Sequence, residues 1–197
     1  MNLLPIAAAP GFFRNLDAAK WGDIGQATLD TLLMLAGALL LTLLIGLPLG
    51  VALFLCGAPQ LRRRPVLYGA LAAVINLLRS VPFIILMIAM IPLTLMLMGT
   101  SLGVRGAILP LVVGAAPFYA RLVETALREV DRGIIEASQA MGATTRQLVW
   151  RVLLPEARPG LIAGATVTTI ALIGFTAMGG AIGSGGLGDV CLLYTSD

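Results

Sequence analysis

The chain has 197 residues, of which 58% are hydrophobic and 12% are charged, and its mean hydropathy is +0.97. This composition excludes a soluble globular domain and indicates a polytopic, all-α membrane protein. With no histidine and two distant cysteines, Cys56 and Cys191, the sequence excludes His-dependent chemistry and suggests neither a zinc site nor a disulfide framework. We expect no metal site and no cofactor.

Charge-free intervals place the expected membrane spans, because about 20 apolar residues cross a bilayer and a bare charge in hydrocarbon is costly. Residues 1–28 are expected to form a partly amphipathic lead-in without a convincing signal peptide. The first span is expected within Leu29 to Leu55. There Gly46 and Gly50 have a spacing that lets another helix approach closely, and Pro48 predicts a kink.

The second span is expected from Val66 to Leu95, and it contains an arginine, Arg79, shortly before Pro82. An arginine at this depth is expected to point into the bundle, to snorkel, or to meet backbone carbonyls freed by Pro82. Two interpretations stay open: a pathway or gate residue, and a structural arginine that satisfies a broken helix. Asn76, one turn earlier, can serve either role.

The third span is expected from Val104 to Leu122, with a bend within Gly114 to Pro117. Arg121, Glu124 and Arg128 follow at helical spacing where this helix leaves the membrane. We expect these three side chains to form a solvated, paired surface.

The fourth span is expected from Gly160 to Met178, where Gly160 and Gly164 suit close helix contact. Three threonines of this span can hydrogen-bond across an interface: Thr166, Thr168 and Thr169. The glycine-rich loop from Gly183 to Gly188 follows a span rather than a strand, so we expect a flexible, tightly packed turn and no nucleotide site.

The one long charged segment, residues 131–159, lies between the third and fourth spans. Its first half has helix-forming composition and stops at Gly142, a residue type that tolerates the left-handed turn ending a helix. Thr144 and Gln147 have the spacing of a capping box, which predicts the start of a second helix. Pro155 and Pro159 are expected to limit that helix at its far side.

The distribution of basic residues predicts the orientation of the chain by the positive-inside rule. Three basic residues, Arg14, Lys20 and Arg105, fall on one side. Nine fall on the side of the hairpin: Arg62, Arg63, Arg64, Arg121, Arg128, Arg132, Arg146, Arg151 and Arg158. The hairpin is therefore expected in the cytoplasm and the N-terminus outside.

The hairpin also carries a motif: Glu-Ala-Ser, three residues, Gly, nine residues, then Val-Leu-Leu-Pro. This resembles the "EAA" loop of bacterial ABC importer permeases, whose pattern is E-A-A, three residues, G, nine residues, I-x-L-P. In that family the loop docks on the ATP-hydrolysing subunit. The resemblance implies that Glu136 is a polar anchor, Gly142 the tight turn, and Leu154 and Pro155 the junction to the fourth span. The motif residues are Glu136, Ala137, Ser138, Gly142, Val152, Leu154 and Pro155.

Further stretches, NLLRSVPFIIL from Asn76, GTSLG from Gly99 and GAAPFYAR from Gly114, are similar to the methionine-type branch of these permeases. The similarity covers most of residues 28–189 and implies a membrane helical bundle without catalytic residues, which pairs with a second copy and with a separate ATPase subunit. It also implies a bacterial inner-membrane location and delivery of D- or L-methionine by a periplasmic or lipid-anchored binding protein. Membrane lipid would surround the bundle.

The family resemblance implies five spans, whereas four are expected in residues 29–189, with the coupling hairpin at 131–159. Residues 190–197 are too short to cross a bilayer, and we interpret them as a truncated or non-native tail. Met178, at the outer end of the fourth span, is a candidate gate residue because methionine is flexible, with ordinary packing as the other interpretation.

Other interpretations of the hairpin and the bundle stay open. The hairpin alone also fits a surface element without a partner or a helix-turn-helix that enters DNA, although membrane-length flanks argue against nucleic acid. The bundle also fits a permease for another amino acid or small solute, a channel, or a membrane-embedded enzyme. An enzyme would need several ionisable groups at depth, and Arg79 alone does not supply them.

Overall fold

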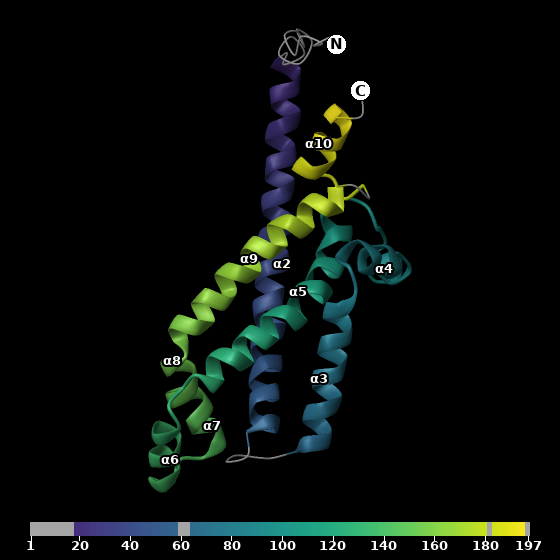
Figure 1. Ribbon diagram of the computed structural model, residues 1–197. Coiled ribbons are helices and arrows are strands. Elements are labelled where there is room, and N and C mark those ends of the chain that lie inside the picture. Colours follow the sequence, from purple (N-terminus) through teal and green to yellow (C-terminus); the bar gives the residue numbers. More distant parts are fainter. Residues whose placement is uncertain (1–17, 59–63, 181–182, 196–197) are drawn as a thin grey trace, which may run out of the picture.

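The computed structural model describes residues 18–58, 64–180 and 183–195, and the regular elements in these ranges are all helices (Figure 1). Within them α2, α5 and α9 are long and apolar enough to cross a membrane, and the bent pair α3–α4 can supply a fourth span. Arg62 and Arg63, part of the arginine cluster, lie outside the described residues. The elements are α2 (Ala18–Gly57), α3 (Pro65–Ser80), α4 (Phe83–Met98), α5 (Gly103–Arg128), α6 (Arg132–Ala140), α7 (Thr145–Gln147), the π-helix η1 (Leu148–Leu153), α8 (Leu154–Glu156), α9 (Arg158–Gly180) and α10 (Leu187–Thr195).

Helix α2 packs against α5 through two glycines, as their spacing predicts. A Cβ atom at Gly50 would lie 2.6 Å from the backbone oxygen of Ala120, and one at Gly46 would lie 2.8 Å from Cδ1 of Tyr119. Larger side chains would push the two backbones apart. Helix α2 begins at Ala18, so the last part of the expected lead-in belongs to this helix.

The start of α9 packs on the last turns of α5, where a Cβ atom at Gly160 would lie 2.8 Å from Cβ of Ala126. This confirms the close contact expected there. The three threonines of α9 do not hydrogen-bond to a neighbouring helix; each hydroxyl donates to a carbonyl four residues earlier in α9 itself. Such local bonds satisfy a hydroxyl in an apolar setting without a second helix.

The expected second span is a broken helix, as Pro82 predicts, because α3 and α4 meet at a bend of 106°. Proline lacks a backbone N–H and disfavours helix in the residue before it, and Val81 is accordingly extended, with φ −78° and ψ 125°. The carbonyl of Pro82 then accepts hydrogen bonds from the amides of Ile85 (3.0 Å) and Leu86 (3.1 Å), which starts α4. We call the stretch Ser80 to Phe83 the elbow.

The hairpin, the end of α2 and the start of α3 lie at one end of the molecule, which we call the inner end, and the start of α2 and α10 lie at the other, which we call the outer end (Figure 1). At the second end Gly183, Gly185 and Gly186 have positive φ angles. A Cβ atom on Gly188 would overlap the backbone oxygen of Ala177, so tight backbone packing is confirmed for this turn.

Candidate functional site

The first half of the hairpin is a helix, α6, closed at both ends by the expected residue types. Asp131 caps its start, where Oδ1 accepts a hydrogen bond from the amide of Gly133 (2.6 Å). The turn after α6 contains Gly142 at φ +81°, and a Cβ atom there would meet nothing within 4 Å. The backbone conformation, rather than a lack of space, therefore makes glycine the favoured residue at this turn.

The second half of the hairpin begins with the predicted capping box. The amide of Thr144 donates to Oε1 of Gln147 (2.9 Å), and the amide of Gln147 donates to Oγ1 of Thr144 (3.4 Å). This helical stretch runs through η1 and α8 and ends at Glu156, between Pro155 and Pro159, so the expected limit at its far side is confirmed. A single turn residue, Ala157, separates it from α9, and Pro159 lies in the first turn of α9, where the missing N–H is not required.

The hairpin is held against the inner end of the bundle by apolar contacts. Ile135 of α6 and Leu148 and Leu153 of η1 are buried in one cluster with Leu127 and Val130 at the end of α5. The hairpin therefore cannot move without moving the helix ends on which it packs.

The side of the hairpin that does not pack on the bundle is exposed, and it combines apolar and charged side chains. Met141 is 82% exposed. A groove of about 330 Å³ runs between Met141, Gln147 and Arg151. Methionine and arginine are residue types enriched where proteins bind one another, so this surface is suited to docking a protein.

The structure divides the motif residues into an outer and an inner set. Glu136, Ala137 and Gly142 are exposed, whereas Val152, Leu154 and Pro155 are partly buried beneath them. Ser138 is buried, and its hydroxyl donates to the carbonyl of Ile134 (2.7 Å). That local bond satisfies the hydroxyl where the motif pattern has alanine.

A cluster of ionised side chains lies at the inner end of α5, close to the hairpin. Glu124 is only 3% exposed; it pairs with Arg121 (2.7 Å) and with Arg128 (2.8 Å) and accepts a hydrogen bond from the hydroxyl of Tyr68 (3.2 Å). The expected pairing is confirmed, but the expected solvation of Glu124 is wrong, because α3 lies over this face of α5. Arg121 also donates to Oδ1 of Asn76 (3.0 Å), and Arg128 donates to the hydroxyl of Tyr68 (3.5 Å), so α3 and α5 are joined at more than one place.

Sequence reasoning missed Tyr68 because it lies 56 residues from Glu124 and no local pattern connects them. A tyrosine close after an arginine cluster at the start of an apolar helix is a weak signal, since a buried hydroxyl needs a partner. Asn76 contacts Arg121, and within the described residues it makes no hydrogen bond to Arg79.

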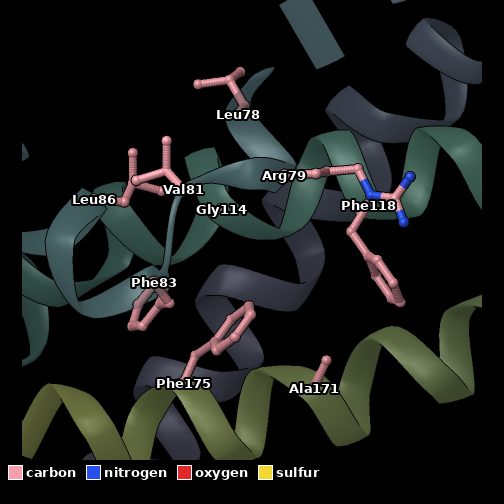
Figure 2. A pocket seen from close by; sticks show the side chains of 9 residues that line it. All are labelled: Leu78, Arg79, Val81, Phe83, Leu86, Gly114, Phe118, Ala171 and Phe175. Atoms are coloured by element: carbon pink, nitrogen blue, oxygen red, sulfur yellow. The ribbon is translucent and has the colours of Figure 1, made fainter. Parts of the chain in front are cut away.

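Arg79 occupies a second, separate site at the elbow. Its guanidinium carbon lies 5.5 Å from the centre of the Phe118 ring. Figure 2 shows both side chains at a cavity of about 380 Å³. Met178 is 50% exposed near the outer end of α9 and does not line this cavity. In the described ranges no group of three or more His, Cys, Asp or Glu side chains is placed to hold a metal ion.

Comparison with known families gives a match over residues 46–194 to the binding-protein-dependent transport system inner membrane component. The D-methionine transport system permease protein MetI of Salmonella typhi is 56% identical over 136 residues, which cover 69% of this chain and 63% of that protein. The chain thus spans less than two thirds of that relative's length. The methionine import system permease protein MetP of Bacillus subtilis is 50% identical and covers 91% of this chain and 79% of that protein.

Two solved structures have the same fold. A chain of the MetNI methionine ABC transporter, in inward-facing conformations, superposes with a TM-score of 0.89 at 47% identity and covers 92% of this chain and 84% of that one. A chain of an amino acid ABC transporter with histidines superposes with a TM-score of 0.70 at 18% identity, covering 91% and 82%.

Proposed function

Because the chain belongs to the family of binding-protein-dependent transport system inner membrane components, we propose that it is the membrane-spanning subunit of an ATP-driven methionine importer. The observation that carries this proposal is the hairpin. Its family motif lies on a compact element with an exposed surface, packed against α5 and continuous with α9. Relatives named for methionine transport support the substrate, as either the D- or the L-form.

In this proposal the hairpin docks on a separate ATPase subunit and transmits its movement. Glu136 is the polar anchor, Gly142 keeps the turn tight, and Leu154 and Pro155 join the hairpin to α9. Two copies of the chain form the pathway between them. Movement of the ATPase shifts the population between inward-facing and outward-facing packings of the bundle. Met178 is the proposed gate residue at the outer end of α9.

We place the chain in the bacterial inner membrane with the hairpin in the cytoplasm and the start of α2 outside. The hairpin, the end of α2 and the start of α3 share one end of the molecule (Figure 1), and the hairpin segment is rich in arginine. A periplasmic or lipid-anchored binding protein then delivers the substrate at the opposite end.

Co-purification of the full-length gene product with its candidate ATPase tests the coupling role. Glu136→Arg reverses an exposed charge in the motif, and Gly142→Trp places a side chain on a backbone at φ +81°. Both variants are expected to retain much less ATPase than the wild type. Glu129→Arg is the matched control, since Glu129 is exposed at the end of α5 but outside the motif.

All variants must first appear in the membrane in wild-type amounts. The coupling role is wrong if the wild type retains no ATPase, or if both motif variants retain as much as the Glu129→Arg control. If coupling holds, ATP-driven methionine uptake into proteoliposomes that contain the full complex tests the substrate.

A further inference from the structure

The cavity at the elbow lies between four helices and has one polar feature. Side chains from α3, α4, α5 and α9 converge on it (Figure 2). Its volume of about 380 Å³ is in the range typical of small-molecule sites. Arg79 provides a guanidinium, and the other lining side chains are apolar.

Arg79 differs in its surroundings from Arg121 and Arg128, the two arginines at the end of α5. Arg121 and Arg128 both pair with Glu124. Among the residues that the structure describes, Arg79 has no carboxylate partner and contacts the ring of Phe118 instead. Ionisable groups at membrane depth pair with an opposite charge or face a cavity on a transport pathway. An anion that enters this cavity is thus a suitable partner for Arg79.

The backbone at the elbow supports binding of a molecule that carries both charges. Helix α3 ends at Ser80 and helix α4 begins at Phe83, which lines the cavity. The last turn of a helix carries free carbonyl groups and the first turn carries free N–H groups. A broken membrane helix therefore offers partners for an ammonium and for a carboxylate at one place.

Aromatic rings form the opposite wall of the cavity. The rings of Phe83 and Phe175 stack with their centres 4.2 Å apart, and Figure 2 shows them facing one another across from Arg79. Aromatic rings make favourable contacts with thioether sulfur and with short apolar chains. Such a wall suits an uncharged side chain and disfavours a charged one.

We propose that this cavity binds a zwitterionic amino acid with a short apolar side chain, whose carboxylate pairs with Arg79 and whose side chain packs on Phe83 and Phe175. The inference rests on the proposed transport function and identifies a substrate site within the membrane.

A charge comparison between ligand and protein tests the site. Binding of L-methionine and of L-methioninamide, which lacks the carboxylate charge, is measured by saturation-transfer NMR on the permease–ATPase complex in nanodiscs without binding protein. The wild type is expected to bind methionine about 10- to 100-fold tighter than the amide, because hydrogen bonds to charged groups contribute this much. Arg79→Gln is expected to bring the ratio near one, and Arg79→Lys to keep part of the preference.

The control is Arg105→Gln, which removes an exposed arginine of α5 that does not line the cavity and is expected to leave the ratio unchanged. The site is wrong if Arg79→Gln weakens both ligands equally, as for a purely structural arginine. The proposed site is also wrong if the wild type binds methionine and methioninamide equally well, which is the result expected when a lipid phosphate pairs with Arg79. It is likewise wrong if methionine does not bind.

ATP-driven methionine uptake by the wild-type complex separates the two proposals. Uptake together with an unchanged methionine-to-amide ratio in Arg79→Gln overturns the site alone. Loss of uptake in the wild type overturns the proposed function and, with it, the site.

Discussion

The end of α5 and the elbow each hold a charged side chain, but only the one at the end of α5 is ion-paired within the described residues. At the inner end Glu124 is buried and paired with two arginines and a tyrosine, so its charge is fully engaged within the chain. At the elbow Arg79 faces a cavity with an aromatic ring as its contact. The difference separates charges that hold the bundle together from a charge that is available to a ligand.

The largest effect on stability is expected from Glu124→Gln, which leaves Arg121 and Arg128 without their carboxylate. Breaking a buried ion pair costs about 3–5 kcal/mol, and we expect about 2–3 kcal/mol here because the two arginine side chains are 20% and 48% exposed. Thermal unfolding in detergent measures the loss. The exposed Glu129→Gln is the control, and an equal loss in both variants would remove the distinction between the two regions.

A smaller effect is expected from Tyr68→Phe, which removes one hydrogen bond to Glu124 and keeps the ring. The expected loss is about 1 kcal/mol, since the carboxylate retains both arginines. Combining Tyr68→Phe with Glu124→Gln should cost less than the sum of the single losses, because the two side chains interact. Full additivity in that double-mutant cycle would contradict the contact.

The smallest effect is expected from Arg79→Gln, which removes a charge that has no ion pair among the described residues. Stability should change by about 0.5 kcal/mol or less, as for substitutions outside packed or paired sites. The same thermal unfolding assay measures it. A loss as large as that of Glu124→Gln would show that Arg79 holds the elbow together, in favour of the structural interpretation.

The parts of the fold that local chemistry determines could be predicted from the sequence. The capping box at Thr144, the turn at Gly142 and the close contact at Gly50 each follow from a residue type at a known spacing. The family motif indicates the position of the hairpin in the sequence.

The remainder depends on contacts between distant segments or on geometry that no short pattern encodes. Pro82 predicts a broken helix, but the 106° angle is fixed by packing of α4 against α5 and α9. The burial of Glu124 requires α3 to lie over α5, and its partner Tyr68 is far away in the sequence. The stretch Leu148 to Leu153 is a π-helix, which composition does not distinguish from an α-helix.

The helical path from η1 through α8 into α9 is nearly unbroken, so a tilt of the hairpin also tilts the fourth span. Helix α9 has 23 residues and is therefore about 35 Å long. A tilt of about 5° at the hairpin end displaces the far end by about 3 Å, which is close to the diameter of a water molecule. A small angular change at the hairpin end of α9 is thus converted into a displacement of a few ångströms at its far end.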